Sequence, residues 1–249
     1  MKNSWMYGQH MLFNLPPLTP WNATNANQCT LDQIIPYWKD NDTLTFFVDL
    51  GLYHPSFSRF LDEGEKEHEL RYKTAVSRKR FVVSRTILKH ILRHVLDTPT
   101  CSDVILIRKK YGRIFIKDVP GIFISLSYSG TSLAITIGKH KIGSDIEVLR
   151  TVDIRKIKTH PLFYDPGARN EKERTRHFLQ VWTLLEAYAK LRDRNTYVCL
   201  TENTFPPDVN FASYCINNTS VFSLASGPDS GKDVLLWLDT AGIGLSSEY

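Results

Sequence analysis

The chain has 249 residues, of which 42% are hydrophobic and 23% charged, and its formal net charge is +5. This composition is typical of a globular protein, and no apolar run approaches the roughly 18 residues that a membrane span needs. We expect a cytoplasmic protein without a signal peptide or membrane contact, because the first residues lack a hydrophobic segment and the four cysteines form no C-x-x-C pair of a redox or zinc motif.

The first half of the chain combines strand-like runs with one long helical pattern. Residues 1–40 are rich in Pro, Asn and aromatic residues and predict an irregular wrap. Residues 54–70 contain turn and helix material, and apolar residues at helical spacing predict a helix over Ser77–Val95. Strands are expected at Leu44–Leu50, Val104–Arg108, Ile114–Ile116, Ile122–Ser127 and Leu133–Gly138.

Cationic residues crowd the start and the length of this helix. They are Arg71, Lys73, Arg78, Lys79, Arg80, Arg85, Lys89 and Arg93. Clustered cations favour an anionic partner, such as nucleic acid, a phosphorylated cofactor or an acidic protein, although a solvated helix face is the ordinary alternative. The chain has no recognisable nucleic-acid motif, so we expect no nucleic-acid partner.

The second half begins with an expected strand at Lys141–Val148. Residues 155–175 contain prolines and many charges and predict a loop with short helices, and a second long helix is expected over Arg176–Leu191. Strand-like pieces follow at Tyr197–Leu200, Ser220–Leu224 and Val234–Leu238.

A weak internal repeat relates the two halves of the chain. In each half a strand with an aspartate, Asp49 or Asp145, precedes a long helix by a similar number of residues. We therefore predict an α+β fold of two similar halves, residues 1–140 and 141–249, related by a pseudo-twofold axis. Each half would be a small antiparallel sheet packed on a long helix, with a ligand cleft between the halves.

Two short segments combine carboxylates with a lysine. Asp145 and Glu147 end an apolar strand, and Trp182, Glu186 and Lys190 share one helix face because they are four residues apart. A divalent metal that also holds a phosphate needs this set, since Mg²⁺ binds through carboxylates and phosphate oxygens. Taken singly, the first segment could be a solvated loop entry, and Glu186 and Lys190 an ordinary ion pair.

The order of these segments resembles the 4′-phosphopantetheinyl transferases of the surfactin-synthetase-activating (Sfp) type. Gly143–Glu147 is similar to the family pattern G-[IV]-D-[IV]-E, and Phe178–Lys190 to [FY]-x-x-x-W-[ST]-x-K-E-[AS]-x-x-K. Upstream, Tyr111–Arg113 resembles Y-G-K/R-P and Phe123–Ser129 resembles F-N-x-S-H-S, and the helix with Arg85 precedes both. The resemblance covers about residues 70–205.

The resemblance implies transfer of the phosphopantetheine arm of coenzyme A, the co-substrate, to a serine of an apo acyl or peptidyl carrier protein, with release of 3′,5′-ADP. The implied catalytic residues are Asp145, Glu147, Glu186 and Lys190. The three carboxylates would hold Mg²⁺, with Mn²⁺ as an alternative ion, and Glu186 could also act as the general base. Lys190 would contact the pyrophosphate.

Five further residues are implied to bind coenzyme A. Arg85 and Lys73 would hold the 3′-phosphate, and Arg113 would border the adenine. Ser127 and Tyr128 would flank the phosphates. The protein is expected to act as a monomer, because a chain with two similar halves has no need to dimerise.

Three positions depart from the family pattern. Leu185 replaces the lysine before the glutamate, Tyr128 replaces a histidine, and Ser144 replaces an apolar residue. These changes leave open a second interpretation, a relative that binds coenzyme A or a carrier protein without transfer. A third, a nucleic-acid-binding protein built on the basic helix, predicts salt-sensitive binding to DNA or RNA.

Overall fold

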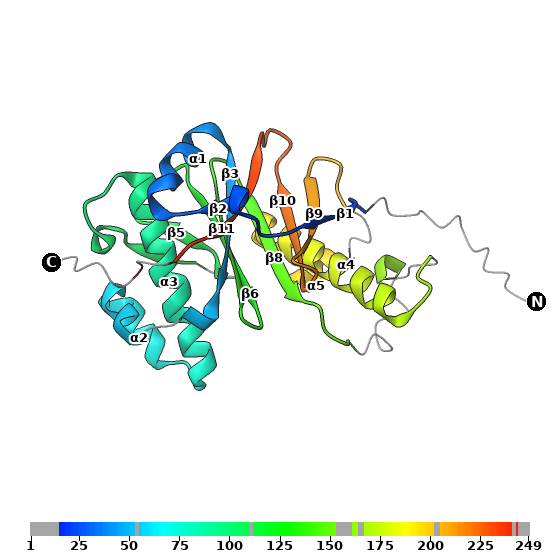
Figure 1. Ribbon diagram of the computed structural model, residues 1–249, viewed down its shortest axis with the longest axis horizontal. Coiled ribbons are helices and arrows are strands. Elements are labelled where there is room, and N and C mark those ends of the chain that lie inside the picture. The colour runs from blue at the N-terminus through cyan, green and yellow to red at the C-terminus, as the bar shows by residue number, and fades with distance from the viewer. Residues whose placement is uncertain are drawn as a thin grey trace, which may run out of the picture.

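The structure is a computed structural model that describes residues 15–52, 55–109, 112–152, 161–163, 167–201, 205–240 and 243. It is a mixed α+β structure with two sheets and several helices (Figure 1). Within the described part of the chain, no helix combines the length and the apolar character that a membrane span requires.

The larger sheet has seven strands in the order β2-β11-β3-β7-β6-β5-β4. Its centre is antiparallel, with β3 paired to β7 and β7 to β6, whereas β11 runs parallel to β3. The central strand β3 is buried from Thr43 to Val48, which explains its nearly continuous apolar sequence. The strands are β2 (Gln28–Cys29), β3 (Thr43–Asp49), β4 (Leu106–Arg108), β5 (Ile114–Ile116), β6 (Phe123–Ser129), β7 (Ser132–Gly138) and β11 (Asp233–Leu238).

The smaller sheet has four strands in the order β1-β9-β10-β8. The turn between β9 and β10 places Asn217 and Asn218 at φ angles of 47° and 56°, and asparagine tolerates this left-handed region better than most residues. The strands are β1 (Leu18–Trp21), β8 (Ile142–Val148), β9 (Asn210–Ile216) and β10 (Ser220–Ser226).

Two helices of 22 residues each, α3 (Ala75–Leu96) and α4 (Glu171–Arg192), dominate the helical part of the fold. Thr74 and Asn170 cap their amino termini by accepting a backbone N–H bond, and both helices end at an aspartate in the left-handed region. Three shorter helices are α1 (Ile34–Asp40), α2 (Glu63–Leu70) and α5 (Thr196–Thr201).

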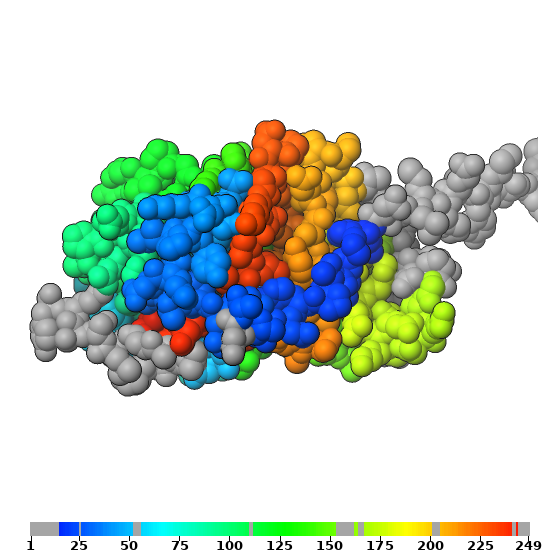
Figure 2. Space-filling view, turned by 45° about the horizontal axis from the view of Figure 1, so that its top comes forward, coloured from blue at the N-terminus to red at the C-terminus, as the bar shows by residue number. Residues whose placement is uncertain are grey.

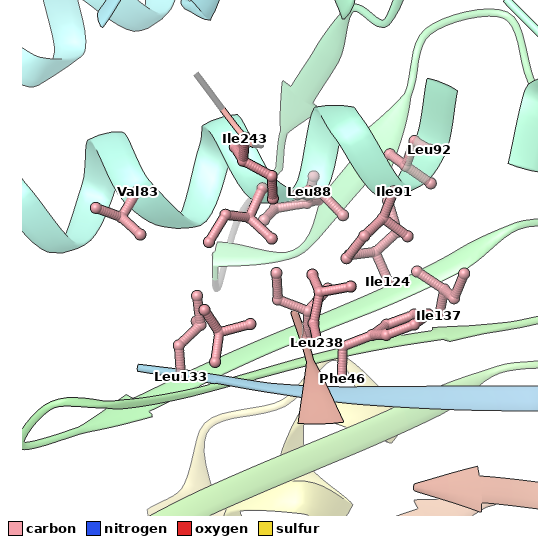
Figure 3. Close-up of a cluster of buried hydrophobic side chains, with 14 of the residues drawn as sticks. Phe46, Val83, Leu88, Ile91, Leu92, Ile124, Leu133, Ile137, Leu238 and Ile243 are labelled. Carbon is pink, nitrogen blue, oxygen red and sulfur yellow. The ribbon is translucent and has the colours of Figure 1, made fainter. Parts of the chain in front are cut away.

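An apolar layer separates α3 from the seven-stranded sheet. Figure 3 shows Val83, Leu88 and Ile91 on α3 facing side chains of the strands, which include Phe46 and Leu133. Fully burying a side chain of this kind contributes about 1.5–3 kcal/mol. The main core of the described residues therefore lies between this helix and the larger sheet.

Helix α4 packs directly on β8 and β10, and Gly143 permits that contact. A Cβ atom at Gly143 would lie 2.0 Å from the carbonyl oxygen of Ala187 and 2.5 Å from the amide nitrogen of Leu191. Only glycine lets two backbones approach this closely. The glycine of the G-x-D-x-E segment thereby brings the end of α4 next to Asp145.

Most of the predicted elements are present in the structure. The strand predicted at Tyr197–Leu200 is wrong, because this segment is the helix α5. Asn195 starts that helix: its side chain accepts from the N–H of Tyr197, and its carbonyl accepts from the N–H of Val198. A short apolar run does not distinguish strand from helix, so this local cap decides.

The ends of the chain were also predicted too simply. Residues 1–40 are not only an irregular wrap, since they contain β1, β2 and α1, and β9 was not foreseen. The strand β1 forms through a parallel pairing with the distant β9, which also pairs antiparallel with β10, the next strand in the chain. Figure 2 shows the first described residues, in dark blue, along one face of the molecule beside strands coloured orange and red.

Each end of the chain joins the sheet formed mainly by the opposite half of the sequence. The strand β1 pairs with β9 in the four-stranded sheet, and β11 pairs with β3 in the seven-stranded sheet. The pseudo-twofold axis and the division into residues 1–140 and 141–249 stay predictions.

Candidate functional site

A cavity of about 450 Å³ opens between α3, β6 and the carboxyl-terminal end of α4. Five of its lining residues are cationic, and two, Glu186 and Asp193, are acidic. An excess of cations at a cavity favours an anionic ligand. Its side chains of chemical interest are Tyr72, Phe81, Ser84, Arg85, Arg108, Arg113, Ser125, Ser127, Tyr128, Glu186, Lys190, Asp193, Arg194, Asn195 and Thr196.

Three serines on β6 join the two sheets beside this cavity. Ser125, Ser127 and Ser129 share one face of the strand, because they are two residues apart. Their hydroxyls accept from the backbone N–H groups of residues 144, 146 and 148 on β8, at 2.9, 3.2 and 3.1 Å. These hydroxyls act in place of a backbone ladder between β6 and β8, so they fix β8 against the larger sheet.

The same serines orient the two carboxylates of β8. Ser127 Oγ donates to Asp145 Oδ1 at 2.6 Å, and Ser129 Oγ donates to Glu147 Oε2 at 2.7 Å. Ser127, which was predicted to flank the phosphates of the ligand, therefore bonds directly to Asp145 and also lines the cavity.

Lys190 connects β8 to α4. Its ammonium group lies 2.8 Å from Asp145 Oδ1 and 2.9 Å from the carbonyl oxygen of Ser144. Glu186 lies one helical turn earlier and also lines the cavity. Glu186 and Lys190 thus line the cavity, and Asp145 contacts Lys190 without lining it. Glu147 lies two residues beyond Asp145 on the same strand face.

The environment of Glu186 raises the pKa of its carboxyl group. Burial is the largest cause, and the negative charges of Asp145 and Glu147 act in the same direction. A hydrogen bond from Thr196 and the charge of Lys190 oppose the rise. The three carboxylates are therefore near enough to influence one another.

The residue types at this wall fit a hard divalent cation, because they offer carboxylate oxygens. Among the described residues, however, no three His, Cys, Asp or Glu side chains converge in a metal-binding arrangement. Asp145 is bonded to Lys190, and Glu147 is bonded to Arg150 at 2.7 Å. The three carboxylates are of the type that a metal needs, but two of them are paired with cationic side chains.

Arg85 projects from α3 into the opposite wall and is buried. Its Nε lies 3.8 Å from Glu65 Oε1, and Glu65 also pairs with Lys89 at 2.7 Å. Burial is the main cause that lowers the pKa of Arg85, and the charge of Glu65 opposes it. Lys73, by contrast, is exposed in the turn before α3 and is not among the residues that line the cavity.

Arg113 is held from several sides. Its Nη1 donates to Asp193 Oδ2, and its guanidinium carbon lies 5.7 Å and 5.9 Å from the ring centres of Phe115 and Phe123. Its Nη2 is buried and has no hydrogen-bond partner among the described residues. Tyr111, which belongs to the same motif, lies outside the described residues.

The three departures from the family pattern have different surroundings. Leu185 is buried in an apolar cluster that includes Val181 and Tyr188, and it does not line the cavity. Ser144 Oγ accepts from Thr136 at 2.8 Å, which satisfies this polar group inside the core. Tyr128 is 45% exposed and lines the cavity, with the guanidinium of Arg80 5.2 Å from its ring centre.

Several residues of the cavity wall were not predicted. Arg108, Asp193 and Thr196 line it, and Asp193 contacts Arg113 directly. An aspartate two residues after a predicted helix is typical of a cap, but no local pattern indicates a distant arginine as its partner. The alternation of serines at 125, 127 and 129 was readable as one polar strand face.

No family model matches the chain. Curated proteins named as 4′-phosphopantetheinyl transferases are similar to it, and psf-1, gsp and Sfp are three of them. The psf-1 protein of Bacillus pumilus is 21% identical over 128 residues, 49% of this chain and 53% of that protein. The gsp protein of Aneurinibacillus migulanus is 26% identical over 147 residues, 57% of this chain and 59% of that protein. Sfp of Bacillus subtilis strain 168 is 22% identical over 139 residues, 54% of this chain and 61% of that protein.

The chain thus spans about half the length of these curated relatives. These relatives differ from the chain at most aligned positions, but all of them are named as the same kind of transferase. The comparisons therefore support the 4′-phosphopantetheinyl transferase family that the ordered motifs indicate, over about half of the chain.

Proposed function

We propose that this protein is an Sfp-type enzyme that transfers the 4′-phosphopantetheine arm of coenzyme A to a serine of an apo acyl or peptidyl carrier protein. The proposed reaction depends on Mg²⁺ and releases 3′,5′-ADP. The similarity to named transferases supports the reaction type. The cavity supports the substrate class, because its cationic lining suits a ligand with several phosphates.

One observation carries the proposal. Glu186 and Lys190 lie one turn apart where α4 borders the cavity, and Lys190 bonds to Asp145 on β8 at 2.8 Å. An acid–base group, a cation and a second carboxylate thus meet at the edge of a cavity rich in positive charge. Phosphoryl transfer relies on this kind of positioning and charge stabilisation.

In the proposed reaction, the serine oxygen of the carrier protein bonds to the phosphorus that bears the pantetheine arm. The bond between that phosphorus and the oxygen of 3′,5′-ADP breaks, and Glu186 takes the serine proton, directly or through a water molecule. Burial and the neighbouring carboxylates raise the pKa of the Glu186 carboxyl group.

The other side chains bind and orient the substrate. Asp145, Glu147 and Glu186 would hold Mg²⁺, whose positive charge stabilises negative charge on the pyrophosphate. Lys190, which bonds to Asp145 at 2.8 Å, would contact a pyrophosphate oxygen. Arg85 would bind the 3′-phosphate of coenzyme A.

The test is transfer by the purified protein. The protein is incubated with coenzyme A, Mg²⁺ and a panel of apo carrier proteins, and the intact mass of each carrier is measured. We expect one carrier to gain the mass of one phosphopantetheine arm, and a chelator to prevent the gain. Binding of coenzyme A in calorimetry without transfer to any carrier would contradict the proposal and favour a binding-only relative.

A further inference from the structure

We propose that Asp193 is a positioning residue, which holds Arg113 so that its Nη2 group donates to an uncharged acceptor on the nucleobase of the bound ligand. This inference rests on the proposed function, since the ligand is taken to be coenzyme A. Asp193 would not contact the reacting phosphorus. It would act through Arg113.

The backbone of Asp193 is in a conformation that usually selects glycine. It follows the last residue of α4 with φ 54° and ψ 43°, and its N–H donates to the carbonyl oxygens of Ala189 and Lys190. Glycine adopts this left-handed cap without steric cost. Aspartate tolerates this backbone better than most residues, and at this position its side chain also binds Arg113.

Asp97 provides an internal comparison. It ends α3 with nearly the same backbone angles, φ 53° and ψ 42°, and its N–H donates to the carbonyl oxygens of Arg93 and His94. Asp97 is exposed and does not line the cavity, whereas Asp193 does. The two caps share their local geometry and differ in whether the carboxylate reaches the cavity wall.

The contacts of Arg113 leave one of its buried donor groups without a hydrogen-bond partner among the described residues. Its side chain is 6% exposed, Asp193 binds Nη1, and Phe115 and Phe123 lie against the guanidinium. The buried Nη2 has no partner among the described residues. A buried donor of this kind gains from a ligand acceptor, because leaving it unpaired is unfavourable.

Charge favours an uncharged acceptor for this donor. Asp193 neutralises Arg113, so the pair offers hydrogen bonds with little net charge. A ring nitrogen of a nucleobase suits such a pair better than a phosphate does. The pair lines the cavity and links the two sheets, because Arg113 lies before β5 of the larger sheet and Asp193 ends the helix on the smaller sheet.

The test compares Asp193→Gly and Asp193→Asn with Asp97→Gly. Glycine removes the carboxylate while favouring the cap, and asparagine keeps the shape and tolerates the left-handed backbone. Calorimetry with coenzyme A and with 3′-dephospho-coenzyme A should give a Kd about tenfold higher in both Asp193 variants. The ratio of the variant Kd to the wild-type Kd should be the same for both ligands. In the transfer assay, the Asp193 variants should have a raised KM for coenzyme A and an unchanged kcat. Asp97→Gly should bind both ligands as the wild type does.

The outcomes separate this inference from the proposed function. Wild-type affinity in both Asp193 variants would overturn the role of Asp193 alone. An Asp193→Gly effect that persists in an Arg113→Met background would also overturn it, because the aspartate would then not act through Arg113. If the wild-type protein binds neither ligand, the proposed function fails, and this inference fails with it.

Discussion

The two long helices border the same cavity, but they are fixed in different ways. Helix α4 touches the backbone of β8 through Gly143, and its Thr183 hydroxyl lies 2.7 Å from that of Ser223 on β10. Helix α3 is separated from its sheet by a layer of large apolar side chains (Figure 3). Near the cavity, α3 is held by buried ionic contacts from Glu65 to Arg85 and Lys89.

This difference matches the tasks proposed for the two helices. Direct backbone contact leaves little freedom, so α4 can present Glu186 and Lys190 to β8 at defined distances. On the other wall, the buried carboxylate of Glu65 holds Arg85, whose positive charge is available to a ligand in the cavity. The wall proposed for chemistry is therefore built on backbone packing, and the wall proposed for binding on side-chain charge.

The largest expected effect is at the catalytic wall. Glu186→Gln should lower the rate of carrier modification by about 10²–10³-fold or more, because the amide can neither take a proton nor bind a metal as a carboxylate does. Far-ultraviolet circular dichroism should be unchanged. Glu171→Gln, at the exposed amino-terminal end of the same helix, is the control and should keep wild-type turnover. Normal turnover by Glu186→Gln would remove this residue from the mechanism.

The helix contact itself can be broken at Gly143. Gly143→Ala should lower the free energy of unfolding by at least about 3 kcal/mol, because the added Cβ would overlap the backbone of α4. Urea denaturation followed by circular dichroism measures the change. Gly227→Ala is the matched control, since a Cβ there meets nothing within 4 Å, and should change stability by less than about 0.5 kcal/mol. Equal stability of the two variants would contradict the close contact.

The burial of His90 on α3 as a neutral group can be tested by the pH dependence of stability. Burial, aided by the charges of Arg93, His94 and Arg59, lowers the pKa of His90 from 6.5 to about 4. His90 binds a proton near pH 6.5 in the unfolded chain but only near pH 4 in the folded chain. Its contribution to the free energy of unfolding is therefore complete above pH 6.5 and is lost as the pH falls toward 4. The loss attributable to His90 between pH 7 and pH 5 should be about 2 kcal/mol.

The measurement is urea denaturation at both pH values for the wild type and His90→Gln. Glutamine does not titrate, so the variant should lose about 2 kcal/mol less than the wild type over this range. Other titrating groups contribute equally to the pH dependence of both proteins, so the difference between them removes these contributions. One such group is Glu65, whose pKa is raised mainly by burial. Parallel curves would show that His90 is not buried as a neutral group.

The sequence predicts the α4 wall better than the α3 wall, for a physical reason. The strand and the helix that form the α4 wall carry local patterns, Gly143–Glu147 and residues four apart on a helix, so Asp145, Glu186 and Lys190 could be named together. Arg85 was predicted from its helix, but its partner Glu65 lies on α2, and no local pattern relates them. The same limit explains why Asp193 was missed, since only the tertiary fold brings it to Arg113.

The smallest expected effect is at the seam between the two sheets. Ser125→Ala should lower the free energy of unfolding by about 1.5 kcal/mol, because the buried N–H of Ser144 loses the hydroxyl that accepts from it at 2.9 Å. Ser102→Ala, at an exposed position, is the control and should be neutral within about 0.5 kcal/mol. If Ser125→Ala also slows carrier modification more than it raises the KM for coenzyme A, the seam positions Asp145 for chemistry. A variant as stable and as active as the wild type would mean that backbone packing by α4 fixes β8 without help from β6.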